Sequence, residues 1–328
     1  MSSLHRRKSW EIPESALTPE PAYLNRRELL RRLGFTGLGA AAMLMGCGTN
    51  SVDAQGEVWK PVGLPGRNPN AKLYPATRSA KYGLDRALTA EKPTATYNNY
   101  YEFTTDKERV WRLAGSFPTR PWEVHVNGLV ERPGRFSVDE LVKEFGLEER
   151  TYRHRCVEAW AMAVPWTGFP FTKLVEKVGV KGNATHVRTV SFLDPENAVG
   201  QKEQPWYPWP YFEGMRMDEA MHELAFVATG IYGHELPKQN GAPWRLVLPW
   251  KYGYKSAKAM VSIEFVDKQP KTFWNEEAPL EYSFLSNVDP TRPHPRWSQA
   301  HERLIDTGEM VPTQPFNGYG DQVAKLYA

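Results

Sequence analysis

The chain of 328 residues contains two cysteines, Cys47 and Cys156, and this scarcity sets the strongest limit on what it can fold into. Cys47 lies in an N-terminal segment that has the features of an export signal. If that segment is removed, or if Cys47 is lipidated, the body keeps one thiol and cannot form an internal disulfide. Iron–sulfur clusters usually need about four cysteines, and the Cys-x-x-Cys-His pattern of covalent haem is absent. A redox cofactor in this body would therefore have no second redox centre beside it. It would take electrons from a partner or a diffusible donor.

The export signal begins at Asn25, where Asn-Arg-Arg-Glu-Leu-Leu-Arg precedes an uncharged stretch from Leu33 to Gly48. A double arginine ahead of such a stretch is typical of a twin-arginine signal. The stretch has 16 residues, many of them Gly or Ala, whereas a membrane-spanning helix needs roughly 20 apolar residues. We predict a twin-arginine signal peptide over residues 1–54, recognised by the twin-arginine translocase, and a periplasmic protein.

Two processing sites compete within this segment. The small-residue sequence ending at Ala54 would release a chain that begins near Gln55, which is our preference. The sequence Leu-Met-Gly before Cys47 resembles a lipoprotein site and would leave a lipid anchor. Twin-arginine export resembles the route of proteins that load a cofactor in the cytoplasm, so we expect a complex cofactor.

The charge balance of the body argues against nucleic acid as a partner. The whole chain has a formal charge of +3; residues 1–54 hold seven Lys and Arg against five Asp and Glu, which leaves 34 against 33. A nucleic-acid-binding domain usually has a strongly basic face or stripe. With 41% hydrophobic and 24% charged residues, the body is instead expected to be globular.

Patterns of strand and helix are mixed along the body. Residues 122–130 alternate apolar and polar positions into Asn127-Gly128, which predicts a β-hairpin. Ser137 and Glu140 form a capping box ahead of an apolar face at helical spacing, which predicts a short helix. Further strands are predicted at 185–193, 224–229, 244–248 and 259–266, and further helices at 172–178 and near 298–306.

Because strands and short helices do not alternate regularly, we predict an α+β fold with mixed β-sheets. Residues 55–95 contain five prolines among polar positions and are expected to form an extended arm. Residues 96–328 are expected to form one large folded domain.

Cys156 directly follows three potentially cationic residues, Arg153, His154 and Arg155. Positive charge lowers the pKa of a thiol towards the thiolate that attacks or binds metal. We therefore expect a functional thiol, although an inert buried cysteine is a common alternative. We assign no acid or base role to His154 or Glu158, because either side chain can simply satisfy hydrogen bonds in the core.

A second group of cations surrounds a glycine-containing loop. Arg245, Lys251, Lys255 and Lys258 fall within 14 residues, and cations beside free backbone N–H groups suit a phosphate. A solvated basic face is the alternative. The aromatic loop at 205–212 either packs on the core or forms the rim of a substrate entrance.

Three segments taken together resemble a known family. They are Tyr-Asn-Asn-Tyr-Tyr-Glu-Phe at 97–103, Arg-His-Arg-Cys-Val-Glu-Ala-Trp at 153–160 with its continuation to 170, and Gln-Asn-Gly-Ala-Pro-Trp-Arg at 239–245 with its continuation to 258. They resemble the sulfite-oxidase-like molybdenum fold, and within it the molybdopterin subunits of periplasmic protein-methionine-sulfoxide reductases. The resemblance runs from Tyr97 to the C-terminus and includes residues 294–300 and 316–319.

The resemblance implies a molybdenum–molybdopterin cofactor with Cys156 as the metal ligand, in agreement with the affinity of soft thiolates for redox metals. The residues matched to the family's cofactor pocket are Asn98, Tyr101, Glu102, Ser191, Asn240, Arg245, Ser256, Ala257 and Lys258. Ser191 stands where the family has Thr, and Ser256-Ala257 stands where Gly and an apolar residue are expected.

The implied activity is reduction of methionine sulfoxide in oxidised periplasmic proteins by oxygen-atom transfer to the metal. The implied electron source is quinol, through a haem-containing integral membrane subunit that would associate the protein with the inner membrane. Two alternatives remain: a sulfite-dehydrogenase-like enzyme, which should place extra arginines for an anionic substrate, and an exported binding protein without catalytic activity.

Overall fold

The computed structural model describes residues 68–328. The predicted signal peptide, both processing sites and the first part of the predicted arm lie outside the described residues. The helices are α3 (Glu91–Thr96), α4 (Val110–Leu113), α5 (Val138–Phe145), α6 (Phe171–Val178), α7 (Val199–Glu203), α8 (Met217–Ala220), α9 (Phe273–Glu277) and α10 (Gly320–Val323). In the part of the chain from 68 onward, no helix has the length and hydropathy needed to span a bilayer.

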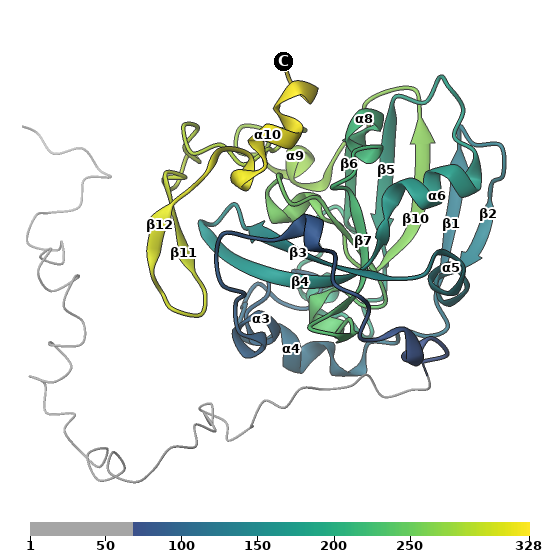
Figure 1. Cartoon of the computed structure of the whole chain (residues 1–328), viewed down its shortest axis with the longest axis horizontal. Coiled ribbons are helices and arrows are strands. Elements are labelled where there is room, and N and C mark those ends of the chain that lie inside the picture. The colour runs from purple at the N-terminus through teal and green to yellow at the C-terminus, as the bar shows by residue number, and fades with distance from the viewer. Residues whose placement is uncertain (1–67) are drawn as a thin grey trace, which may run out of the picture. The chain divides into compact units, whose positions relative to one another are not determined.

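The strands form two sheets (Figure 1). Their bounds are β1 (Glu123–Gly128), β2 (Gly134–Ser137), β3 (Glu148–Arg155), β4 (Trp160–Pro170), β5 (His186–Ser191), β6 (Phe212–Arg216), β7 (Phe226–Ile231), β8 (His234–Glu235), β9 (Arg245–Val247), β10 (Met260–Val266), β11 (His301–Leu304) and β12 (Met310–Pro312). The first sheet has the order β2-β1-β10-β5-β6, in which β1 and β10 are parallel and the other neighbours are antiparallel.

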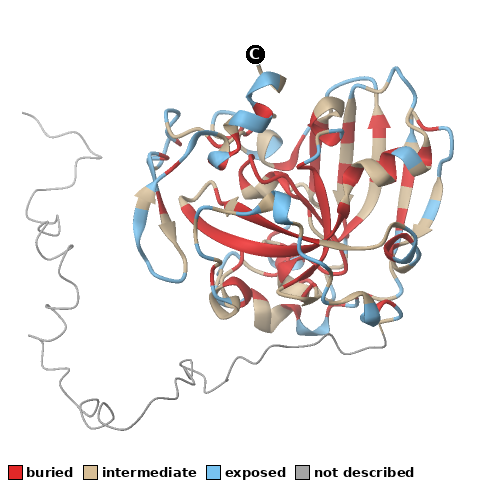
Figure 2. Cartoon of the chain, viewed as in Figure 1, coloured by how far each residue is buried: buried red, intermediate tan, exposed pale blue. Residues whose placement is uncertain are grey.

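The second sheet is built around β4, which is buried along nearly its whole length (Figure 2). It pairs antiparallel with β3 and β7 and parallel with β11, while β12 follows β11 and both β8 and β9 pair with β7. Both sheets thus mix parallel and antiparallel neighbours, and the predicted α+β fold is confirmed.

Gly168 allows β4 and β7 to approach where their register shifts. A Cβ atom at this position would lie 1.9 Å from the carbonyl oxygen of Val227. Only glycine fits there, because a side chain would push the central strands of the sheet apart.

Local patterns predicted several elements correctly. Ser137 caps α5 and accepts a hydrogen bond from the backbone N–H of Glu140 at 3.4 Å, and the predicted apolar face is buried. The β1–β2 hairpin also forms, but Asn127-Gly128 is not its turn. Both residues stay paired with β10, and residues 129–133 connect the two strands. Pairing with a third strand has therefore overridden the local turn signal.

The helix predicted near 298–306 is wrong, because residues His301–Leu304 form strand β11. The carboxylate of Glu302 is buried in this strand and pairs with Arg155 at 3.0 Å and with Arg86 at 2.9 Å. A strand places this side chain between the two guanidinium groups, and no local pattern in the sequence encodes those distant partners.

The predicted arm runs along the second sheet. The backbone N–H of Ser79 donates to the Glu149 carbonyl at 2.8 Å, and that of Thr89 donates to the Ala163 carbonyl at 2.9 Å. The end of the arm differs from the expectation, since Glu91–Thr96 is helical rather than extended. This helix leads directly into the 97–103 segment and sets its position.

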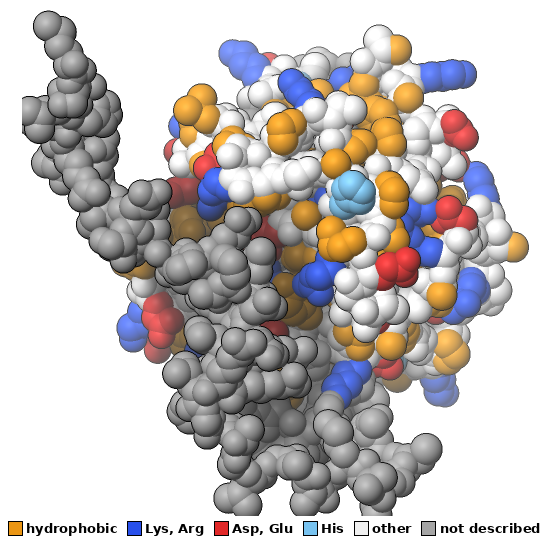
Figure 3. Space-filling model, turned by 90° about the vertical axis from the view of Figure 1, so that its left-hand side faces the viewer, with side chains coloured by type: hydrophobic (Ala, Val, Ile, Leu, Met, Phe, Trp, Pro, Cys, Tyr) orange, Lys and Arg blue, Asp and Glu red, His pale blue; other side chains and the backbone are white. Residues whose placement is uncertain are grey.

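The surface carries charges of both signs. Figure 3 views the described residues from the side that carries β11 and β12, and its blue, red and orange side chains are interspersed. On the part of this face that is visible, no basic stripe of the kind used to bind nucleic acid is present.

We predict that Glu302→Gln lowers the free energy of unfolding by about 3–5 kcal/mol, because it leaves two buried guanidinium groups without a counter-charge. Urea unfolding of the cofactor-free protein measures this. The control is Glu223→Gln, which removes an exposed ion pair with Lys81 and should cost less than about 1 kcal/mol. Equal, small losses of unfolding free energy in the two variants would contradict this structural role of Glu302.

Candidate active site

Cys156 lies at the tip of the hairpin formed by β3 and β4. Its backbone N–H donates to the Trp160 carbonyl at 2.9 Å, and its carbonyl accepts from the N–H of Ala159 at 3.1 Å, which closes a tight turn. Ala159 has a φ of +60°, a conformation that is costly for a residue with a side chain. The long pairing of the two strands holds this strained turn and thereby fixes the position of the sulfur.

The sulfur has two hydrogen-bond donors. Asn99 Nδ2 lies 3.1 Å from Sγ, and the backbone N–H of Glu158 lies 3.4 Å from it. The Glu158 carboxylate accepts from the same Asn99 Nδ2 at 3.1 Å and from Trp160 Nε1 at 3.4 Å, and it pairs with Lys107 at 2.9 Å. The carboxylate is therefore held beside the sulfur, with Oε2 at 4.0 Å from Sγ.

The expectation that neighbouring cations lower the pKa of Cys156 is wrong for the protein alone. Alternation along β3 directs Arg153 to Asp85 and Arg155 to Glu302, while His154 faces the cavity at the sulfur. Burial raises the pKa of the Cys156 thiol to about 12, and the charge of Glu158 adds to the effect. A thiolate here requires a positive charge that a coordinated metal would supply.

A cavity extends from Cys156 into the protein. It contains about 900 Å³ of empty space including its opening. The lining residues are Asn98, Asn99, Tyr101, Glu102, His154, Cys156, Val157, Glu158, Trp160, Met162, Tyr211, Gln239, Asn240, Arg245, Gly253, Tyr254, Lys258, Trp274 and Tyr282.

Most of the residues selected from the sequence meet at this cavity. Those that line it are Cys156, Asn98, Tyr101, Glu102, Asn240, Arg245 and Lys258. Ser191, Ser256 and Ala257 lie behind the wall. Ser191 donates to the Lys258 carbonyl at 2.7 Å, and Ser256 Oγ accepts from the N–H of Leu248 at 3.1 Å, so both support the loop that carries Lys258.

Arg245 and Lys258 bring positive charge to the wall of the cavity, and neither forms an ion pair with a described residue, although the carboxyl group of Glu102 lies close enough to Lys258 for each to shift the pKa of the other. Arg245 donates only to backbone carbonyls, among them that of Asn240 at 3.1 Å. Lys258 lies 4.7 Å from the centre of the Tyr100 ring, and it makes no ion pair with any described residue. Burial lowers the pKa of Arg245 to about 10 and that of Lys258 to about 8.

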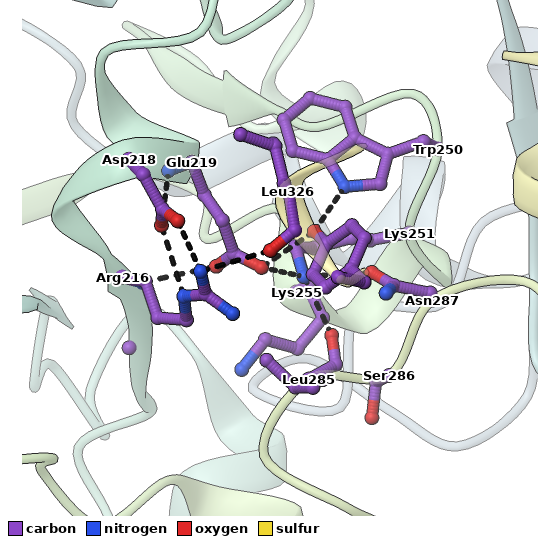
Figure 4. Close-up of polar contacts among 12 residues, drawn as sticks. Arg216, Asp218, Glu219, Trp250, Lys251, Lys255, Leu285, Ser286, Asn287 and Leu326 are labelled. Carbon is purple, nitrogen blue, oxygen red and sulfur yellow. Dashed lines mark hydrogen bonds and ion pairs between the residues drawn. The ribbon is translucent and has the colours of Figure 1, made fainter. Parts of the chain in front are cut away.

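The other two cations predicted to bind phosphate are neutralised elsewhere. Lys251 pairs with Glu219 at 2.5 Å, and Lys255 pairs with Glu213 at 2.6 Å, with all four side chains buried. Figure 4 shows Lys251 directed towards Glu219 and Asn287. Of the four cations in this segment, only Arg245 and Lys258 line the cavity and can meet an anion there.

The cavity wall also presents unsatisfied acceptors. Asn98 and Asn240 both donate through Nδ2 to the Thr94 carbonyl, at 2.9 and 3.1 Å. Their Oδ1 atoms, and that of Asn99, are buried without a hydrogen-bond partner. A buried acceptor without a partner costs about 1–3 kcal/mol. A bound group with N–H donors would recover this cost.

These features fit a molybdopterin. A pterin carries ring N–H and amino donors. These donors suit a cavity wall that presents asparagine oxygens without a hydrogen-bond partner. Its phosphate suits Arg245 and Lys258. In residues 68–328 no three His, Cys, Asp or Glu side chains are grouped to hold a metal. A single protein thiolate beside ligands from the cofactor is consistent with that.

Several residues that line the Cys156 cavity were not predicted from the sequence. Asn99 was adjacent to a selected residue, and its contact with the sulfur depends on a turn that no sequence pattern encodes. His154 was expected to satisfy hydrogen bonds in the core, but among the described residues neither of its ring nitrogens has a partner. Its pKa is lowered by burial and by Arg245 and Lys258, so the ring is neutral.

The aromatic loop at 205–212 packs on the core, as one of its two interpretations predicted, and its role at a substrate entrance stays a prediction. Tyr211 lines the cavity, and Tyr207 packs against Tyr101 and Trp274, with ring centres 6.2 and 5.7 Å apart. Trp206 projects outward with 67% of its surface exposed. The loop therefore packs on the wall of the cavity and ends in an exposed ring.

Comparisons with known proteins agree with this geometry. Residues 114–274 match the model of the oxidoreductase molybdopterin binding domain. The protein-methionine-sulfoxide reductase catalytic subunit of Burkholderia mallei is 45% identical over 97% of this chain and 93% of its own. The corresponding subunit of Pseudomonas syringae is 44% identical over 96% of this chain and 94% of its own.

A solved structure, the sulfane dehydrogenase SoxCD from Paracoccus pantotrophus, is 19% identical with a TM-score of 0.44, and the match covers 56% of this chain and 51% of that chain. A likeness this small adds nothing to the two relatives above.

We predict opposite effects of two matched substitutions on the cofactor-free protein. Lys255→Met leaves the buried carboxylate of Glu213 without its cation and should lower the free energy of unfolding by about 3–5 kcal/mol. Lys258→Met removes a cation that forms no ion pair and whose neighbour Glu102 has a pKa raised by burial, so stability should stay unchanged or rise by up to about 2 kcal/mol. Urea unfolding measures both. Equal destabilisation would show that Lys258 is a structural cation and not one reserved for a ligand.

Proposed function

Because this chain belongs to the family of protein-methionine-sulfoxide reductase catalytic subunits, we propose that it reduces methionine sulfoxide residues in proteins, with Cys156 as the protein ligand of a molybdenum–molybdopterin cofactor. The observation that carries the proposal is the cavity whose lining includes the thiol of Cys156 and the cations Arg245 and Lys258, neither of which forms an ion pair with a described residue. Its lining thus offers a ligand for a metal and donors for a phosphate.

The protein's own residues bind and orient the cofactor. Arg245 and Lys258 would hold the phosphate, and the free amide oxygens of Asn98 and Asn240 would accept from the pterin. Tyr101 and Glu102 would complete the wall, while Ser191, Ser256 and Ala257 would support the loop behind Lys258. Cys156, fixed by its strained turn, would supply the thiolate.

When bound, the molybdenum centre supplies the two-electron oxygen-atom transfer that converts a sulfoxide to a thioether, with two electrons and two protons completing the turnover and water as the other product. The protein excludes bulk water from this place with Trp160, Trp274 and Tyr282. Asn99 and the N–H of Glu158 hold the sulfur by hydrogen bonds, and such contacts tune a bound metal.

The walls near the sulfur favour a neutral substrate. The carboxylate of Glu158 lies 4.0 Å from the sulfur, and the donors to the sulfur are Asn99 and the N–H of Glu158 rather than Arg245 or Lys258. A sulfite-dehydrogenase-like enzyme would need cations beside the sulfur to bind its anionic substrate. A sulfoxide is uncharged and needs none.

The electron route and the compartment follow from the sequence expectations. The named relatives are catalytic subunits, so this chain works with at least one further component. We propose that this component is a haem-containing integral membrane subunit drawing on quinol. We also propose that residues 1–54 are a twin-arginine signal, that residues 55–95 are an arm, and that residues 96–328 form a periplasmic catalytic domain beside the inner membrane.

The test is an assay of the purified chain, expressed with molybdate, using a reduced dye and free methionine sulfoxide. Wild type should contain about one molybdenum per chain and reduce the sulfoxide. Cys156→Ser should lose at least a hundredfold in kcat while keeping its fold, the scale expected when a ligand of the catalytic metal is lost. Folded wild-type protein that binds no molybdenum under these conditions would refute the proposal.

A further inference from the structure

A second recess opens beside the Cys156 cavity. The recess has a volume of about 600 Å³. Val157, Tyr254 and Tyr282 line both spaces. Sites that enclose a ligand typically have roughly 300–1,000 Å³. The recess is thus large enough for a ligand and begins one residue away from the sulfur.

The recess is preformed, because buried contacts tie its wall to the core. Lys251 donates to the Leu285 carbonyl at 2.7 Å and to Asn287 Oδ1 at 2.9 Å, and both acceptors belong to residues that line the recess. The same ammonium group pairs with the buried Glu219 (Figure 4). Collapse of this wall would break a buried ion pair, which is strongly unfavourable.

The walls of the recess combine an exposed apolar side chain with an exposed guanidinium group. Leu280 is 95% exposed, an unusual position for a leucine beside a recess. Arg292 is also exposed, and it forms no ion pair within residues 68–328. Pro279, Pro293 and Pro295 contribute no backbone N–H. The recess therefore offers an apolar contact and a guanidinium donor to whatever enters.

We propose that this recess binds the extended polypeptide that flanks a methionine sulfoxide in a protein substrate. The inference rests on the proposed function. A sulfoxide that reaches Cys156 as part of a polypeptide brings its main chain to the mouth of the cavity, and the recess continues that mouth through shared walls. Arg292 donates to main-chain carbonyls, and Leu280 packs against an apolar side chain next to the methionine. A folded segment would not fit, because the main chain must follow the recess.

The test compares two substrates in a double variant, Leu280→Ser with Arg292→Ser, using a reduced dye as the electron donor. The substrates are free methionine sulfoxide and an unfolded polypeptide oxidised at its methionines. We expect kcat/KM for the polypeptide to fall roughly tenfold, mainly through KM, which corresponds to the loss of one good contact. The value for free methionine sulfoxide should stay within about twofold of wild type.

The matched control replaces Met221 and Lys268 with serine, an exposed methionine and an exposed cation that line neither space. It should leave both substrates unaffected. Equal losses on the two substrates, or no loss on either, would overturn the inference. So would a loss seen only when membranes and quinol replace the dye, because the recess would then serve the electron-donating subunit.

A wild-type protein that contains molybdenum but reduces neither substrate would refute the proposed function separately. In that case, fluorescence anisotropy of a labelled unfolded polypeptide still decides the inference. Binding to wild type that is lost in the double variant and kept in the control supports the recess, and equal binding to all three proteins overturns it.

Discussion

The buried guanidinium of Arg155 is the interaction on which the site depends. It pairs with Glu302 on β11, donates to Gln299 Oε1 at 2.9 Å and to Thr313 Oγ1 at 3.1 Å, and also reaches the carbonyl of Cys156. One side chain thus joins the cysteine hairpin to the C-terminal part of the chain. Gln299 in turn donates to the Val157 carbonyl at 2.6 Å, so the turn that carries the sulfur is held from both of its sides.

The electrostatics of the molecule separate structural cations from those available to a ligand. Lys251 and Lys255 are buried against carboxylates and stabilise loops. Arg245 is equally buried and Lys258 is half-buried, neither forms an ion pair with a described residue, and burial lowers the pKa of both. A protein tolerates such a cost where function requires it. The three unsatisfied asparagine oxygens on the same wall have the same explanation.

The sequence predicted the elements whose causes are local and missed those whose causes are distant. Helix α5 follows from its cap and apolar spacing. Strand β3 was missed because its buried arginines make it look like a surface segment, although distant carboxylates and carbonyls satisfy them. Strand β11 was mistaken for a helix because the partners of its buried Glu302, Arg86 and Arg155, are distant in the sequence. At the site, family resemblance located seven lining residues, whereas Asn99 and His154 became visible only once the hairpin was folded.

The proposed function requires that Cys156 ligates the metal in the cavity. X-ray absorption at the molybdenum edge tests it most directly on the loaded protein, because the method counts sulfur neighbours without reference to activity. If Cys156 is a ligand, wild type should show three sulfur neighbours, two from the pterin and one from Cys156. Cys156→Ser should show two. The same number of sulfur neighbours in both proteins would contradict it.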